Sequence, residues 1–142
     1  MLDTFMKIGA YRVDKFDLDD RLNPDAFAFY IRGEKADHGA YCRDAKSQLY
    51  AGLLLLQSKQ MMVNLSGVYV DVDQLKNLQR PAYMQLKADL INGLFNRIFV
   101  LEASTIWEPG IVEDDLRNLY LAVGGFDLLV CREGDCVPLQ IF

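Results

Sequence analysis

The strongest constraint on the fold is a regular alternation of apolar strands and a helix within residues 68–104. An apolar segment there ends at Asp71, a polar loop follows, and Arg80-Pro81 opens a helical pattern that Gly93 closes before a second apolar segment. Proline suits the first helical position because its missing amide hydrogen would have no partner there. The pattern therefore predicts a strand-helix-strand unit.

The rest of the chain repeats this alternation, with 6–13 as one further candidate strand. The expected strands are 26–32, 66–72, 97–102, 126–131 and 137–142, and the expected helices are 45–62, 81–93 and 109–123. Strands that alternate with such helices favour parallel pairing. We predict an N-terminal extension (1–25) and one α/β domain (26–142), a three-layer α/β/α fold with a mostly parallel sheet of four to five strands and an antiparallel edge hairpin.

The helical patterns carry their own boundary signals. Asp44 is placed to cap the first helix, and Leu49, Leu53 and Leu56 recur on one face of it. Gly52 within that helix is expected where another element packs closely. In the second helix the predicted apolar stripe is Tyr83, Leu86, Leu90 and Leu94.

Composition limits the partners and the location of the protein. At 142 residues, 51% of them hydrophobic, the chain fits one globular domain. Its formal net charge is −5 and its basic residues are scattered, so it lacks the basic stripe of an autonomous DNA-binding protein. No apolar run reaches the ~18 residues of a membrane span, and the N-terminus lacks a secretory signal. We expect a cytoplasmic protein that contacts no membrane.

The cysteines and the single histidine indicate no cofactor or metal. Cys42, Cys131 and Cys136 have no CxxC spacing, which argues against a zinc site or a disulfide framework. Cys131 and Cys136 flank a predicted turn and are placed to face each other across a hairpin, where we expect a structural role rather than redox sensing. His38 lies in a polar loop and is interpreted as solvated.

Polar residues follow several of the predicted strands. In parallel sheets, functional groups gather at the carboxyl ends of the strands. Here those ends carry Arg32 and Glu34 after one strand, Asp71 after the next, and residues 102–105 after the third. The sequence thus predicts a polar site at one edge of the sheet.

The residues at these strand ends resemble the catalytic domain of the serine recombinases, the resolvase and invertase family. That family has a strand ending Y-x-R-V-S, S-L-x-x-Q opening a helix, a strand ending in Asp, an Arg-Pro helix start, a closing Gly and a strand running into D-R-L-x-R. The matching positions are Tyr30 and Arg32, Gln48 sixteen residues later, Asp71, Arg80-Pro81 and Gly93. The resemblance covers residues 26 to about 130 and implies a resolvase-like fold.

The departures from the family lie at the reacting positions. The family's serine attacks a DNA phosphodiester, which requires a hydroxyl, whereas Glu34 stands there in this chain. At the family's D-R-L-x-R, this chain has Ser104 in place of the aspartate and Thr105 and Glu108 in place of the two arginines. Arginines stabilise the charge on a transferring phosphoryl group, so their loss implies a domain that is inactive in strand exchange.

Two further observations qualify the resemblance. Residues 6–15 also resemble a recombinase start, with Arg12-Val13 followed by Asp14, but this register leaves over thirty residues before Gln48 and again places an acid at the nucleophile position. The family also continues into a long dimerisation helix and a DNA-binding domain. The resemblance therefore leaves open a truncated gene or an expressed fragment.

Structural roles explain the same charged and polar residues without any catalysis. Arg80 pairing with Asp71 would hold the loop before the second helix, and Arg32 would be held by Glu34 or Glu102. Ser104 has no activating group in its own segment, so we do not expect a relocated nucleophile. Trp107 is expected to be a core residue, with a partner surface as the alternative.

The sequence as a whole predicts a recombinase-like pseudoenzyme without cofactors. Its partners would be itself or an active recombinase, with DNA bound only weakly. One alternative is a recombinase fragment that retains DNA binding or weak strand exchange. Another is an unrelated flavodoxin-like domain that binds a small ligand between strand ends, although no phosphate-cradling glycine loop is present.

Overall fold

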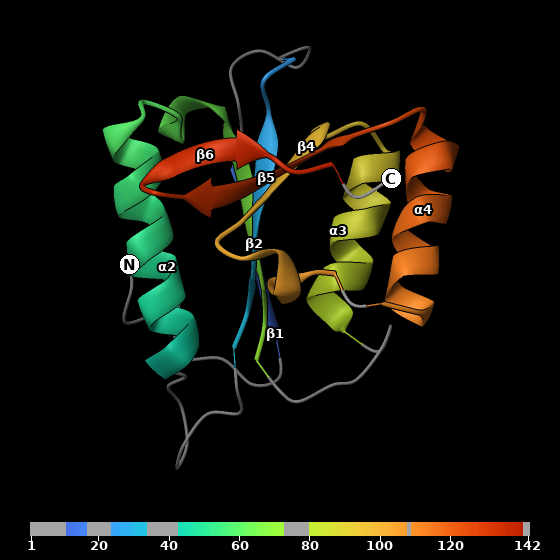
Figure 1. The fold of residues 1–142 in the computed structure, drawn as a ribbon, viewed down its shortest axis with the longest axis horizontal. Helices are drawn as coiled ribbons and strands as arrows, with labels where there is room; N and C mark the ends of the chain where they lie inside the picture. Colours follow the sequence, from blue (N-terminus) through green and yellow to red (C-terminus); the bar gives the residue numbers. More distant parts are fainter. Residues whose placement is uncertain (1–10, 17–23, 34–42, 73–79, 108, 141–142) are drawn as a thin grey trace.

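The computed structural model describes residues 11–16, 24–33, 43–72, 80–107 and 109–140. Within these ranges the chain is a mixed α/β structure with one six-stranded sheet and three α-helices (Figure 1). The strands are β1 (Tyr11–Lys15), β2 (Phe27–Arg32), β3 (Leu65–Asp71), β4 (Arg97–Val100), β5 (Asp127–Arg132) and β6 (Asp135–Pro138). The helices are α2 (Arg43–Ser58), α3 (Pro81–Ile91) and α4 (Ile111–Val123), with short 3-10 helices η1 (Met62–Asn64) and η2 (Ala103–Thr105).

The strand order is β1-β3-β2-β4-β5-β6. The four inner strands pair in parallel, and the outer strands β1 and β6 pair antiparallel to β3 and β5. The mostly parallel sheet and its edge hairpin are therefore as predicted, but the sheet has six strands instead of four to five. The additional strand is β1, which lies in the segment assigned to an N-terminal extension, and its five residues pair with β3.

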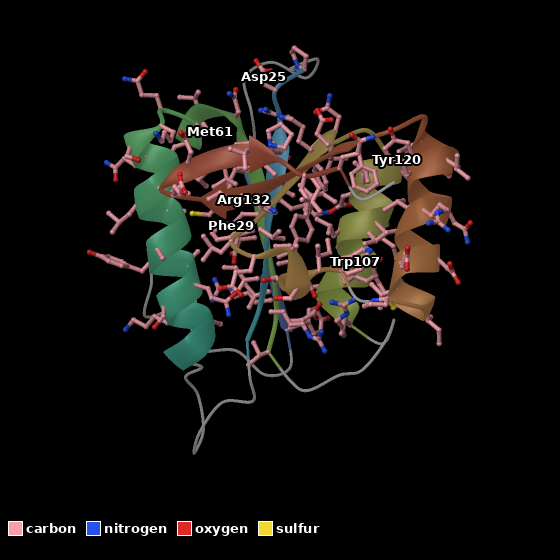
Figure 2. The ribbon with its side chains drawn as sticks, viewed as in Figure 1. Asp25, Phe29, Met61, Trp107, Tyr120 and Arg132 are labelled. Atoms are coloured by element: carbon pink, nitrogen blue, oxygen red, sulfur yellow. The ribbon has the colours of Figure 1, made fainter. Side chains whose placement is uncertain are left out.

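Helix α2 lies on one side of the sheet (Figure 1, green). Its buried Leu49 and Leu56 pack in a cluster with apolar side chains of β2 and β3, and Leu53 is half-buried against that cluster. The expectation for Gly52 is confirmed. A Cβ atom built there would lie 2.2 Å from Cζ of Phe29, a residue labelled in Figure 2, so only glycine lets α2 lie this close to β2.

Helices α3 and α4 lie on the other side of the sheet (Figure 1). Tyr83, Leu86 and Leu90 are buried there as predicted, but Leu94 is 41% exposed because α3 ends at Ile91. The inner face of α4 adds the buried side chains of Val112, Leu116 and Leu119 to the same cluster. Trp107 is half-buried and packs against this cluster, so the predicted core position is confirmed in part.

Glycine and proline set the helix ends where the sequence placed them. Pro81 occupies the first turn of α3. Gly110 precedes α4, and Gly124 follows it with φ of 76°, a left-handed conformation that suits glycine at a helix C-terminus. Asn92 ends α3, and Gly93 follows it with φ of 82°.

The hairpin of β5 and β6 places Cys131 opposite Cys136, as predicted from their spacing. Strand β6 spans Asp135–Pro138, earlier than the predicted 137–142, because the connecting turn has only two residues. None of the helices in the described part of the chain is both long enough and apolar enough to cross a membrane.

Candidate functional site

The carboxylate of Asp71 joins the end of β3 to the start of α3. It is buried, and its Oδ1 accepts the amide of Ala82 at 2.9 Å while its Oδ2 accepts the amide of Tyr83 at 3.0 Å. The first amides of a helix have no partner inside it, and the positive end of the helix dipole favours an anion. Asp71 therefore caps α3 from the neighbouring strand.

Tyr30 and Arg80 complete this arrangement. The Tyr30 hydroxyl donates to Asp71 Oδ2 at 2.7 Å and accepts from Arg80 Nη1 at 3.4 Å. The guanidinium carbon of Arg80 lies 4.5 Å from the centre of the Tyr83 ring, and the whole side chain is buried. We call these residues (Tyr30, Asp71, Arg80, Tyr83) the Asp71 junction. The expected pairing of Arg80 with Asp71 takes an indirect form, through the Tyr30 hydroxyl.

Burial raises the pKa of Tyr30 well above its ordinary value. The negative charge of Asp71 adds to this shift in pKa, and the positive charge of Arg80 opposes it. The pKa of Tyr83 is also raised, first by burial and then by its hydrogen bond to Asp115 at 2.8 Å. Both phenols stay neutral and therefore serve as hydrogen-bond donors.

Next to this junction, a hollow of about 340 Å³ opens at the carboxyl ends of the parallel strands. We call it the strand-end pocket; it is lined by Arg32, Gln48, Leu101, Glu102, Ser104 and Thr105. Gln48 of α2 donates from Nε2 to the carbonyl of Arg32 at 2.9 Å, which fixes the end of β2. Arg80 Nη1 lies 3.5 Å from the carbonyl oxygen of Thr105, so the buried guanidinium also contacts the wall of the pocket.

The structure brings six of the eight sequence-predicted site residues into this region. Four line the strand-end pocket and two belong to the Asp71 junction: Arg32, Gln48, Ser104 and Thr105 in the first, Asp71 and Arg80 in the second. Arg32 and Asp71 are register partners on β2 and β3, which places the two groups side by side. Glu34 and Glu108 lie outside the described residues, as do His38 and Cys42.

The described lining of the pocket offers groups that can contact a ligand. Arg32 supplies a cation and Glu102 a carboxylate, while Gln48, Ser104 and Thr105 supply an amide and two hydroxyls that can donate to a ligand. Within the described ranges no group of His, Cys, Asp and Glu is arranged to hold a metal ion. Among the described lining residues, neither histidine nor lysine accompanies Ser104 as an activating base.

One buried polar cluster was missed by the sequence analysis. Asp89 on α3 is 3% exposed and accepts from the Tyr69 hydroxyl at 2.6 Å, Lys15 Nζ at 3.2 Å and Gln85 Nε2 at 2.9 Å. It joins α3 to β3 and β1. The signal was present, because Asp89 follows Leu86 by three residues and so lies on the buried face of α3.

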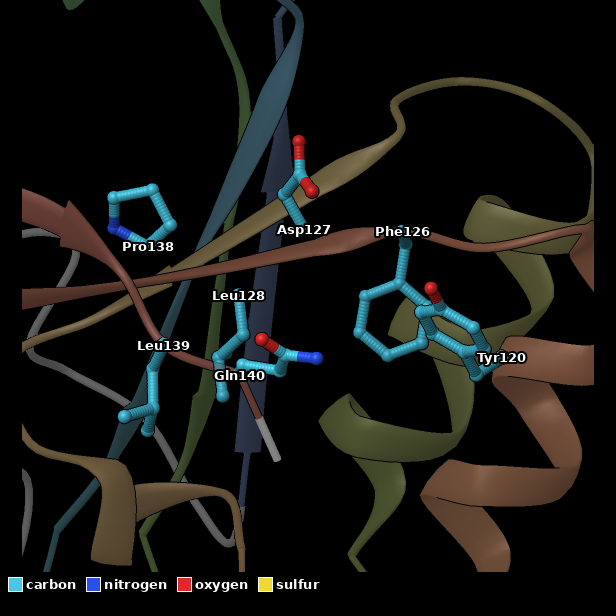
Figure 3. Close-up of a pocket in the computed structure, with 7 residues that line it drawn as sticks. All are labelled: Tyr120, Phe126, Asp127, Leu128, Pro138, Leu139 and Gln140. Carbon is cyan, nitrogen blue, oxygen red and sulfur yellow. The ribbon is translucent and has the colours of Figure 1, made fainter. Parts of the chain in front are cut away.

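A second hollow, also of about 340 Å³, lies at the amino end of β5 (Figure 3). Its lining includes the ring pair of Tyr120 and Phe126, with centroids 5.6 Å apart, together with Asp127 and the chain around Pro138. None of the sequence-predicted site residues contributes to this lining.

The fold and the site define a mixed α/β domain with polar side chains gathered at the carboxyl ends of parallel strands. Comparisons with protein-family models, with curated proteins and with solved structures each found no match for the chain. A proposal for its function therefore rests on the geometry of the site and on the residues that carry the resemblance.

Proposed function

We propose that the chain is a serine-recombinase-like domain, with that family's three-layer arrangement, that has lost DNA strand exchange and acts as a protein-interaction or regulatory module. The observation that carries the proposal is the Asp71 junction. The aspartate that ends one strand and the Arg-Pro that opens the next helix are matching positions in the resemblance, and here they are joined through one tyrosine hydroxyl and two backbone amides.

The arrangement of the domain supports the same proposal. The strand that carries Tyr30 and Arg32 lies between the strand ending in Asp71 and the strand leading to Ser104. Gln48, which follows Arg32 by sixteen residues, reaches back to the carbonyl of that same arginine. Four positions of the resemblance, from three segments that are distant in sequence, thus line one pocket.

The loss of chemistry is proposed from residue types. The position of the nucleophile is Glu34, and a carboxylate there repels a phosphodiester and forms no stable phosphoester. Thr105 occupies an arginine position and lines the pocket with a hydroxyl instead of a guanidinium. One fewer cation at the reacting phosphate removes several kcal/mol of transition-state stabilisation.

The test of this loss is a search for covalent protein–DNA product. Supercoiled plasmids with randomised inserts are incubated with the protein, and end-labelled DNA is separated under denaturing conditions. We expect no adduct and no nicking, and no gel shift at physiological salt because the chain carries a net charge of −5. An adduct that disappears in Glu34→Ala would overturn the proposal and favour a recombinase that retains weak exchange.

The interaction role is tested separately by sedimentation. The chain is examined alone and mixed with the catalytic domain of an active serine recombinase from the same genome. We expect a dimer in the first sample or a complex in the second. A chain that remains monomeric at about 100 µM and forms no complex contradicts this role, since regulatory contacts commonly have micromolar affinity.

A second candidate function is the binding of a small anion, which the strand-end pocket favours. Arg32 lines the hollow together with the donor side chains of Gln48, Ser104 and Thr105, and their attraction for an anion must outweigh the repulsion by Glu102 in the same lining. We expect inorganic phosphate to raise the Tm of the protein at constant ionic strength, and Arg32→Ala to abolish the rise. The control is Arg117→Ala on α4, which leaves the pocket unchanged. An equal rise of Tm in Arg32→Ala excludes this site.

A further inference from the structure

Two cysteines face each other near the tip of the β5–β6 hairpin. Cys131 and Cys136 are paired across the two strands, and both are free thiols of intermediate exposure. Four residues separate them, and the central two form a tight turn in which Glu133 has φ of 52° and Gly134 φ of 76°. Two successive left-handed residues are typical of the tight turn that fixes the register of a hairpin.

The hydrogen bonds of the hairpin decide which kind of pair the cysteines form. In an antiparallel ladder, pairs that exchange hydrogen bonds alternate with pairs that do not. The amide of Leu139 donates to the carbonyl oxygen of Leu128 at 2.8 Å, so residues 128 and 139 form a hydrogen-bonded pair. Because the two kinds of pair alternate, the pairs 130/137 and 132/135 are hydrogen-bonded as well. The Cys131 amide instead donates away from β6, to the Leu101 carbonyl at 3.4 Å. Cys131 and Cys136 are therefore a non-hydrogen-bonded pair.

Such a pair has the backbone spacing that a disulfide requires. Its Cα atoms are about 4.5 Å apart, within the range of about 4.4–6.8 Å found in disulfides. Pro138 supports this assignment, because it lies opposite Leu129 in the next non-bonded pair, where an amide hydrogen is not needed. Both cysteines also pack against the same apolar cluster under α2, so their side chains lie on one face of the sheet.

We propose that Cys131 and Cys136 form a reversible cross-strand disulfide by exchange with a low-molecular-weight disulfide such as glutathione disulfide. One cysteine, as its thiolate, attacks a glutathione sulfur and releases one glutathione. The second cysteine gives its proton to solvent, attacks the protein sulfur of the mixed disulfide and releases the other glutathione. Two protein thiols are oxidised and one glutathione disulfide is reduced to two glutathione molecules.

This site differs from the structural role expected from the sequence, and it does not depend on the proposed recombinase-like function. Burial first, and then the neighbouring Cys131 and Asp135, raise the pKa of the Cys136 thiol, which favours its protonated form. The hairpin is also connected to the strand-end pocket. Leu101, which accepts the Cys131 amide, lines that pocket and packs against the same cluster as the two cysteines.

The experiment equilibrates the full chain, with Cys42→Ser to remove the third thiol, in buffers of increasing ratio of oxidised to reduced glutathione. Thiols are trapped with N-ethylmaleimide and the protein is digested with trypsin. Arg132 lies between the two cysteines in the sequence, so cleavage after it leaves two peptides joined only by a disulfide. We expect to find this linked pair of peptides, and we expect dithiothreitol to separate it. The equilibrium constant for forming the disulfide from glutathione disulfide should be at least about tenfold higher in the folded chain than in the urea-unfolded chain.

The matched control shifts one thiol to the other face of β6. The control variant carries Cys42→Ser, Cys136→Val and Val137→Cys. Neighbouring residues point to opposite sides of a strand, so the thiol at position 137 faces away from Cys131 and we expect only glutathione adducts. The proposal is wrong if the Cys42→Ser chain also carries only glutathione adducts, or if it forms the disulfide no more readily when folded than when unfolded. In the oxidised parent we further expect slower amide exchange of residues 101–105; equal exchange contradicts the coupling to the pocket.

Discussion

At the scale of single residues, the buried carboxylate of Asp71 has three hydrogen-bond partners that are themselves buried. Its carboxylate serves two backbone amides and a phenol, all in a region closed to water. We expect Asp71→Ala to lower the free energy of unfolding by about 3 to 5 kcal/mol, since it leaves three buried donors without their acceptor. Urea unfolding followed by circular dichroism measures this loss.

The control for that substitution is Asp114→Ala. The Asp114 side chain is 74% exposed on α4, and its nearest cation lies 4.0 Å away on Arg117. We expect a change within about 0.5 kcal/mol there. A loss of less than about 1 kcal/mol for Asp71→Ala would contradict its role as the cap of α3.

The buried tyrosines predict instability at alkaline pH. Burial is the first cause that raises the pKa of Tyr30, Tyr69 and Tyr83, and for Tyr69 the hydrogen bond to Asp89 adds to it. Unfolded tyrosine loses its proton near pH 10 while the folded phenols keep theirs. The free energy of unfolding is therefore unaffected by these groups below about pH 10, and above it falls by about 1.4 kcal/mol per pH unit for each of them.

The slope of the free energy of unfolding against pH shows which tyrosines are responsible. We expect Tyr69→Phe to reduce the slope by about one third, because one of three titrating groups is removed. Tyr50→Phe is the control, since its side chain is 57% exposed and should leave the slope unchanged. Unfolding free energies measured between pH 9 and pH 11 in urea provide the comparison, and equal slopes in both variants would contradict the assignment.

Which residues would gather at the strand ends was largely predictable from sequence, but their bonding was not. Arg32, Asp71 and Ser104 follow apolar segments, and parallel strands bring such ends to one edge. The bridge by Tyr30 was not predictable, because it depends on which strands are neighbours and on how β2 and β3 are aligned. The burial of Arg80 depends on two tyrosine rings, Tyr83 one turn further on in α3 and Tyr30 on the distant strand β2, and the second could not be foreseen from the local sequence.

At the scale of elements, the distance between α2 and the sheet is set by Gly52. Alanine favours a helix by about 1 kcal/mol over glycine, yet its Cβ would lie 2.2 Å from the Phe29 ring. Overpacking of this kind costs about 1 to 3 kcal/mol or more. We expect Gly52→Ala to be destabilising by about 2 kcal/mol in thermal or urea unfolding, opposite in sign to helix propensity.

A double-mutant cycle separates the contact from the backbone. In a Phe29→Leu background the ring is gone, and we expect Gly52→Ala to be nearly neutral or stabilising there. Ala51→Gly, one exposed residue earlier, reports the backbone contribution alone and should cost about 1 kcal/mol. The same loss for Gly52→Ala with and without Phe29 would refute the close contact.

Element boundaries were predictable where proline or glycine fixes the backbone. Pro81, Gly110 and Gly124 mark helix ends in the structure as they do in the sequence. Strand β1 was harder, because Tyr11–Lys15 carries three charged residues and lacks the apolar run of an inner strand. It is held instead by pairing with β3 and by the Lys15–Asp89 contact, both of which depend on residues more than fifty positions away.

At the scale of the whole molecule, the order of the strands determines where stability resides. Strand β2 lies between β3 and β4 and is buried along its length except at Arg32, whereas β1 has one neighbour and no buried residue. This order could not be deduced from the alternation of strands and helices, because several orders satisfy the same pattern of parallel pairing. The apolar run of β2 did predict burial on both faces, which α2 on one side and α3 with α4 on the other provide.

Hydrogen exchange is the measurement that tests this gradient of stability. Amides of β2 are bonded within the centre of the sheet, so we expect them to exchange only when the whole domain unfolds. Amides of β1 open locally at the sheet edge, and peptides covering 11–15 should exchange at least about tenfold faster than peptides covering 27–32. Asp89→Ala removes the carboxylate that holds Lys15 and should speed the exchange of β1 further while leaving the order of the two strands unchanged. If β1 exchanges as slowly as β2, the edge strand belongs to the same cooperative unit as the core.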